Sequence, residues 1–313
     1  MRRAATLGGY RLSVPHNPAR LRARAIVGTT LALVLAVAVY AIYHTAPSGT
    51  PAPPPPGCQA GLGDQAIALD TDQAAIAATI AGVAARKRLP RQAVTIALAT
   101  ALQESKLHNL DYGDRDSVGI FQQRPSEGWG PAVDLENPVY ATTKFYAALT
   151  KLPGYTAMPV SQAAQDVQHS ADGSAYAQWE GMAAQLTSYF TGQSPHGVSC
   201  WYTPSGRANL AAAMRNIAET FGPTGHKAVV GGVTLTRSSK KGAQRTAVLH
   251  VRPASAWTVA NWLVANAQGY SLTEVRYAGY VWKAANGSMG WQRASTPTST
   301  SGKNASQGGI VAG

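Results

Sequence analysis

The chain has 313 residues, of which 27 are lysine or arginine and 15 are aspartate or glutamate, and its net charge is +12. This length is enough for an anchor and one or two modest domains. The two cysteines and seven histidines show no metal-ligand spacing, so the sequence does not support a metalloenzyme and predicts neither a metal nor a cofactor.

The N-terminal part predicts a membrane anchor. Residues 1–24 carry +6 and are expected to form a disordered basic tail in the cytoplasm. Residues 25–43 are uncharged and, as a helix, would rise about 28 Å, close to the hydrocarbon thickness of a bilayer. No lysine or arginine follows until Arg86. Because basic residues favour the cytoplasmic side, residues 25–43 are expected to be a single-pass anchor in the cell membrane, with the rest of the chain on its outer side. A cleaved signal peptide is the alternative, and it exports the same residues.

A Pro-rich linker, 44–57, should be extended and should separate the anchor from a first domain, 58–203, which carries −4. Cys58 and Cys200 lie near the ends of that domain. In an oxidising compartment we expect them to pair, the alternative being two free buried thiols.

This first domain is predicted to be all helical. Asp70 or Thr71 can begin a first helix that ends near Arg88, and apolar residues at helical intervals predict a second from about Pro90 to Lys106. Residues 108–130 lack a helical period and are expected to be mostly loop. Further helices are predicted from Pro138, from Ser161, and over about 175–190.

Residues 204–293 carry most of the +10 charge of the C-terminal part and predict a small α/β domain. Helices are expected at about 207–221 and 257–267, strands at 229–235 and 247–251, and a hairpin around Gly279. The basic balance favours anionic partners, which outside a membrane would be wall polymers or lipid headgroups, not nucleic acid. The Ser/Thr/Gly-rich residues 294–313 are expected to be disordered.

The strongest chemical signal lies between residues 97 and 123. At about 100° per residue, Glu104 projects roughly 20° from Ala97, on the side of the helix with small apolar residues. Burial there would raise the pKa of the carboxyl group, as a general acid requires, whereas a solvated glutamate near a helix end is the alternative. Ser105 follows directly, and Gly119-Ile120-Phe121-Gln122 comes after a polar loop.

With these motifs and Ala175-Tyr176-Ala177, residues 60–192 resemble the soluble lytic transglycosylase and goose-type lysozyme superfamily, and most of all its actinobacterial, wall-associated members. The resemblance implies a mainly α, lysozyme-like domain, here preceded by one transmembrane helix and followed by the small α/β domain. Its substrate would be the glycan strands of peptidoglycan.

The same resemblance assigns roles to individual residues. Glu104 would protonate the glycosidic oxygen, and Tyr176 would donate a hydrogen bond to Glu104. Ser105, Gly119, Ile120 and Gln122 would orient the acid or bind the sugar. Asp114 and Asp116 are the candidates for a second carboxylate that activates water, although both residues also suit ordinary loop turns.

The third motif departs from the family pattern, because Ala177 stands where an asparagine is common. This removes a polar contact near the acid. It leaves a second interpretation open, namely a non-catalytic wall-binding or scaffolding protein that retains a lysozyme-like groove.

Overall fold

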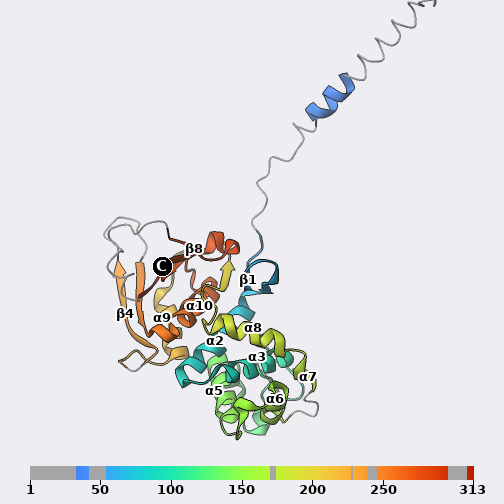
Figure 1. Cartoon of the computed structure of the whole chain (residues 1–313), viewed down its shortest axis with the longest axis vertical. Coiled ribbons are helices and arrows are strands. Elements are labelled where there is room, and N and C mark those ends of the chain that lie inside the picture. The colour runs from blue at the N-terminus through green and yellow to red at the C-terminus, as the bar shows by residue number, and fades with distance from the viewer. Residues whose placement is uncertain (1–32, 42–53, 170–173, 227, 238–244, 295–308) are drawn as a thin grey trace, which may run out of the picture. The chain divides into compact units, whose positions relative to one another are not determined.

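The computed structural model describes residues 33–41, 54–169, 174–226, 228–237, 245–294 and 309–313 (Figure 1). Contacts between residues divide the chain into two units, Met1–Pro53 and Pro54–Gly313.

The first unit corrects the prediction of a membrane anchor. Residues 33–41 are helical, and the rest of the predicted span, the basic tail and most of the linker lie outside the described residues. No helix among the described residues is long and apolar enough to cross a membrane. This finding on the described residues contradicts the predicted transmembrane helix and the single-pass membrane localisation that was inferred from it.

Two long helices form the centre of the second unit. Helix α2 (Thr71–Lys87) begins with a capping box in which Asp70 and Gln73 exchange hydrogen bonds, and it ends at Arg88 in the left-handed region. Helix α3 (Arg91–Ser105) follows after a short turn and is buried along most of its length. It packs against α2, α5, α6 and α8, so the helix that carries Glu104 is fixed on several sides.

Shorter helices surround α3. They are α4 (Ala132–Leu135), α5 (Pro138–Leu149), α6 (Val160–Gln168), α7 (Ser174–Ala177) and α8 (Glu180–Phe190), with 3₁₀ turns at Gly63–Gln65, Pro125–Glu127 and Tyr155–Ala157. Asn137 caps α5 by accepting from the backbone N–H groups of Val139 and Tyr140. The predicted order of helices is thus present, and the long segment 108–130 is loop apart from one 3₁₀ turn.

The region predicted to be all helical also contains an antiparallel sheet. Its strand order is β2 (Ile67–Leu69), β1 (Gly57–Ala60), β3 (Val198–Trp201). Cys58 faces Cys200 across β1 and β3, and the predicted disulfide between them is present. The expectation of a purely helical region was wrong because these strands are very short and pair across 142 residues of sequence.

The C-terminal part builds a second antiparallel sheet. Its strand order is β4 (Val230–Arg237), β5 (Arg245–Val251), β9 (Gly309–Ala312), β6 (Glu274–Tyr277), β7 (Tyr280–Lys283), β8 (Gln292–Arg293). Two helices belong to this part, α9 (Leu210–Phe221) and α10 (Ala256–Ala265), together with 3₁₀ turns at Pro253–Ser255, Gln268–Tyr270 and Ala284–Met289. With two antiparallel sheets, the fold differs from the predicted helical domain followed by a small α/β domain.

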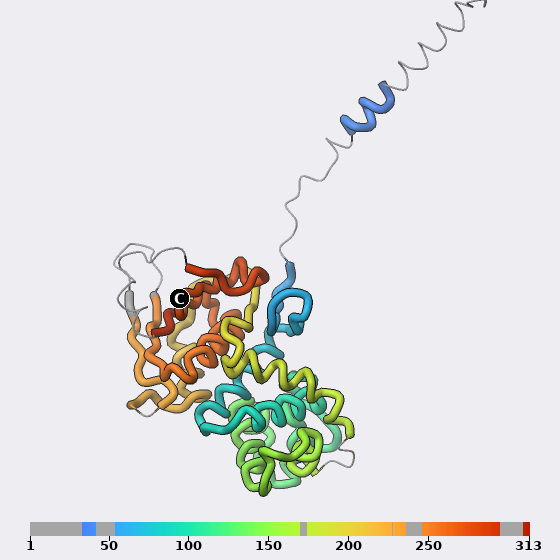
Figure 2. Tube along the Cα trace, viewed as in Figure 1, coloured from blue at the N-terminus to red at the C-terminus, as the bar shows by residue number. Residues whose placement is uncertain are grey.

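Strand β9 corrects the prediction of a disordered tail for residues 309–313, while residues 295–308 of that predicted tail lie outside the described residues. The strand lies between β5 and β6 and pairs with both, so the last residues form the middle of the sheet (Figure 2). Ile310 is fully buried, and the Gly313 carbonyl accepts from the backbone N–H groups of Thr273 and Glu274. A four-residue strand after a Ser/Thr/Gly-rich stretch gives too little periodicity to be recognised.

The C-terminal part also packs directly against β3. The Trp282 indole donates to the Cys200 carbonyl at 2.9 Å, and the Trp291 indole donates to the Val198 carbonyl at 2.8 Å. A Cβ on Gly287 would lie 1.7 Å from the Cys200 carbonyl oxygen, so only glycine fits there. These contacts, with those between α10 and α2, make residues 54–313 one compact unit.

The position of β9 generates a stability prediction. Ile310→Ala removes buried methyl groups from the middle of the sheet and should lower the free energy of unfolding by about 2–5 kcal/mol. Val311→Ala, on the half-buried face of the same strand, is the matched control and should cost less. Urea unfolding of the two variants measures the difference. Equal, small effects would contradict a central position for β9.

Candidate active site

Glu104 lies in the last turn of α3, immediately before the helix ends. Lys106 and Leu107 both have positive φ, and the backbone N–H of Leu107 donates to the Ala101 carbonyl at 3.2 Å. The Lys106 N–H also donates to the Leu102 carbonyl at 3.2 Å, which is the bond of an αL-type helix end and satisfies a carbonyl group that the helix leaves open. The carboxyl group is therefore carried on a well-fixed backbone.

Two side chains from later in the chain bind the same oxygen of Glu104. The Tyr176 hydroxyl donates to Oε1 at 2.6 Å, and Gln168 Nε2 lies 3.4 Å from the same atom. Tyr176 is on α7 and is 1% exposed, and Gln168 is the last residue of α6. The hydrogen bond from Tyr176 to the acid, expected from the third motif, is present.

Burial raises the pKa of Glu104 above its ordinary value. Desolvation is the largest cause, and it is opposed by the hydrogen bonds from Tyr176 and Gln168 and by the charge of Lys106. The net direction is the one that a proton donor needs, because a larger fraction of the carboxyl groups then carries a proton near neutral pH.

The hydrogen bonds also indicate which oxygen carries that proton. The Tyr176 hydroxyl and the Gln168 amide both donate to Oε1, so Oε1 is the hydrogen-bond acceptor. Among the described residues no hydrogen bond reaches Oε2. In the protonated acid the proton therefore belongs on Oε2, where it can be donated outward.

The loop at 119–122 is tied to both helices that hold Glu104. The Ser105 hydroxyl lies 2.9 Å from the Ile120 carbonyl and 3.1 Å from the Ala101 carbonyl, its two alternative acceptors. Gln168 Nε2 donates to the Phe121 carbonyl at 2.7 Å. Ile120 is fully buried, so it contributes backbone and packing at this point and not an exposed side chain.

Gly119 is required where this loop turns. Its φ is +78°, and a Cβ there would lie 2.4 Å from the Leu135 carbonyl oxygen. Val118 and Gln123 pair on either side of the turn, and the Gly119 N–H donates to the Leu110 carbonyl at 2.6 Å. The glycine thus serves a tight turn packed against α4.

Gln122 uses its side-chain amide to hold the preceding loop together. Its Nε2 lies 3.2 Å from the carbonyl oxygens of Tyr112 and Gly119, and its Oε1 accepts from the Ser117 hydroxyl at 3.1 Å. Its described contacts are therefore with loop 112–119, not with Glu104. A role in sugar binding stays a prediction for this residue.

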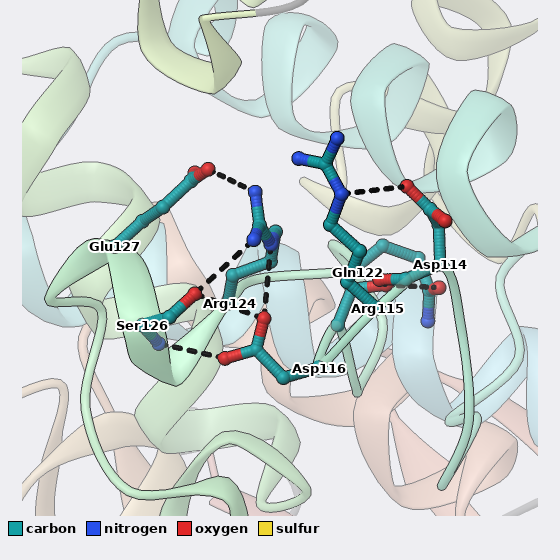
Figure 3. Close-up of polar contacts among 8 residues, drawn as sticks. Asp114, Arg115, Asp116, Gln122, Arg124, Ser126 and Glu127 are labelled. Atoms are coloured by element: carbon teal, nitrogen blue, oxygen red, sulfur yellow. Dashed lines mark hydrogen bonds and ion pairs between the residues drawn. The ribbon is translucent and has the colours of Figure 1, made fainter.

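The two candidate second carboxylates have different surroundings. Asp116 accepts from the Ser126 backbone N–H at 2.7 Å, from the Ser126 hydroxyl at 2.9 Å and from Arg124 Nε at 3.0 Å. In Figure 3 the Arg124 guanidinium lies between Asp116 and Glu127, while Asp114 pairs separately with Arg115 at 3.9 Å.

These contacts decide the protonation of Asp116. The backbone N–H of Ser126 is the main cause that lowers its pKa to about 2, with its hydroxyl and Arg124 adding to the effect. A carboxylate with such a pKa is a weak base, and its bonds assign it to holding the loop. The Asp114 side chain is 92% exposed, and its carboxylate forms a surface pair with Arg115.

The sequence missed several residues around Glu104. Gln168 joins the acid to the 119–122 loop, and its Oε1 is buried without a hydrogen-bond partner in the described part of the chain. Trp179 donates to Gln103 Oε1 at 2.8 Å, and the Lys106 ammonium lies 4.4 Å from the centre of the Trp179 ring. A glutamine carries no recognisable motif, so only its place at the end of α6 could have singled out Gln168.

Comparison with known proteins adds no assignment. No protein-family model matches the chain, and no curated protein matches it. Within the described residues no group of three or more histidine, cysteine, aspartate or glutamate side chains could hold a metal ion. The chemistry of the site must therefore be argued from its own residues.

The contact between Tyr176 and Glu104 generates a first prediction here. The hydroxyl stabilises the charged carboxylate, so Tyr176→Phe should raise the pKa of Glu104 still further. Carbon-13 NMR titration of the glutamate carboxyl groups measures this. Tyr112→Phe, at an exposed loop position, is the matched control and should leave the pKa unchanged. An unchanged or lower pKa in Tyr176→Phe would rule out the hydrogen bond.

Asp116 generates a second prediction, about pH. Because its folded pKa is lowered, its contribution to stability is complete above the ordinary aspartate pKa and is lost as the pH falls through about 2. The Ser126 amide resonance should titrate with that midpoint. Asp116→Asn should abolish the titration and speed amide exchange in the loop, whereas Asp114→Asn should not. A Ser126 midpoint near 4 would contradict the effect of these hydrogen bonds on the pKa of Asp116.

Proposed function

We propose that this protein cleaves the glycan strands of peptidoglycan, with Glu104 as the general acid. The observation that supports this most is the environment of Glu104, a half-buried carboxyl group with a raised pKa that has two donors on Oε1 and, from the described residues, none on Oε2. Oε2 would donate its proton to the bridging oxygen as the glycosidic bond breaks.

The surroundings of Glu104 support the positional precision that such a proton transfer needs. Tyr176, Gln168 and Ser105 join α3, α6, α7 and the 119–122 loop by hydrogen bonds. Phe121 stacks on Phe145, with ring centres 4.5 Å apart, and so packs the loop against α5. A donor held on several sides loses little freedom when the substrate binds.

The carboxylates favour a lytic transglycosylase over a hydrolase. A hydrolase of the two-carboxylate type needs a base or a nucleophile, and Asp116 is bonded to Ser126 and Arg124 with a pKa of about 2. In the proposed reaction the acetamido group of the substrate stabilises the oxocarbenium-like centre. Glu104, now deprotonated, then accepts the proton of the muramyl 6-hydroxyl, which closes a 1,6-anhydro ring.

The proposal predicts the behaviour of a charge-neutral variant. Glu104→Gln keeps the shape of the side chain but has no proton to donate, so the rate of cleavage should fall by about 10²–10⁴-fold. Mass spectrometry of fragments released from purified peptidoglycan measures both rate and product. Anhydro-muramic ends are expected, and the rate should decline as the pH rises above the pKa of Glu104.

Glu180→Gln is the matched control, because Glu180 is an exposed glutamate in the first turn of α8. It should retain full activity. If neither the unmodified chain nor Glu180→Gln releases fragments while both bind peptidoglycan, the non-catalytic wall-binding alternative holds. Equal turnover with and without Glu104 would exclude the proposed acid.

A further inference from the structure

A cavity of about 280 Å³ lies apart from Glu104, where the turn between α2 and α3 meets the start of α10. Three of its twelve lining residues are arginines, Arg88, Arg91 and Arg252, and none is acidic. We call this cavity the arginine pocket. Its charge is therefore strongly positive and is not balanced from within its own wall.

The space exists because the remaining wall is built from small side chains. Apart from Arg91, the residues of α2 and α3 that line the pocket are apolar, and the end of α8 and the residues before and within α10 complete the lining. The apolar members are Ala81, Ala84, Ala85, Leu89, Val94 and Ala254. Such a wall lowers the local dielectric and strengthens the attraction of the arginines for an anion.

Arg252 is the central cation of this pocket. Its Nε atom is buried and has no hydrogen-bond partner within the described ranges. No carboxylate of a described residue pairs with Arg252 or with Arg91. A partly buried guanidinium group that has no carboxylate partner can bind a ligand with two adjacent oxygen atoms through a pair of parallel hydrogen bonds.

The N-terminus of α10 adds to the positive potential. Ser255 is its N-cap residue but makes no side-chain cap hydrogen bond, and both Ser255 and Thr258 line the pocket. The start of a helix attracts anions. The end of α2 does not oppose this strongly, because the Ala84 and Ala85 carbonyls accept from the N–H groups of Leu89 and Arg88.

We propose that the arginine pocket binds a phosphoryl group. A phosphate monoester or diester presents several oxygens to the guanidinium groups, and the pocket, near the lower limit of about 300 Å³ for ligand sites, fits a phosphoryl group with a small substituent. Its source is either the repeating unit of a phosphodiester polymer or a small phosphate ester. This site is distinct from the proposed cleavage site and does not depend on that proposal.

The test uses isothermal titration calorimetry of the full chain with three probes: inorganic phosphate, glycerol 3-phosphate and a glycerol phosphate oligomer. Arg252→Gln and Arg91→Gln should each weaken phosphate binding by about tenfold or more, since each removes charge-assisted hydrogen bonds. Arg207→Gln changes the same charge at an exposed site outside the pocket and should leave the affinity unchanged. Glu104→Gln should also bind phosphate normally.

The probes also separate the two sources. An oligomer that binds more tightly than glycerol 3-phosphate supports a polymer, and one that binds equally or more weakly supports a small phosphate ester. The proposal is overturned if the unmodified chain binds none of the three probes at millimolar concentration. It is equally overturned if Arg207→Gln loses as much affinity as Arg252→Gln and Arg91→Gln.

Discussion

The proposed chemistry depends on the balance of forces at one carboxyl group. Partial burial penalises the charge on Glu104, while the Tyr176 hydroxyl at 2.6 Å stabilises it. Desolvation is the larger effect, so the group keeps an elevated pKa and still has a defined orientation. A fully solvated glutamate would lose its proton too easily, and a fully buried one without Tyr176 would be free to rotate.

Hydrogen bonds between residues far apart in the sequence hold the loops beside Glu104 in place. Ser105 and Gln168 hold successive carbonyl groups of the 119–122 loop, while Asp116 and Gln122 hold the loop that precedes it. Gln122 therefore forms its side-chain hydrogen bonds with backbone and side-chain groups of the loop. The precise placement of Glu104 results from many weak, mutually supporting contacts rather than from one strong pair.

The sequence predicted those features that local chemistry encodes. A helix start at Asp70 or Thr71 and the two long helices were predicted from local patterns, and the structure selects Asp70 as the cap. The pairing of Cys58 with Cys200, expected for an oxidising compartment, is present. Features that depend on distant partners were missed. Strands β1 and β3 pair across 142 residues, and β9 is only four residues long. The contact of Gln168 with Glu104 exists only because α6 ends beside α3.

The most direct test of the central claim is a crystal structure of the Glu104→Gln variant with a bound peptidoglycan oligosaccharide. The account predicts that the bridging oxygen between N-acetylmuramic acid and N-acetylglucosamine lies within hydrogen-bonding distance of the residue 104 side-chain atom that replaces Oε2. Tyr176 should still contact the other atom of that side chain. A saccharide bound elsewhere, or one whose glycosidic oxygens all lie beyond reach of residue 104, would contradict the assignment of Glu104 as the proton donor.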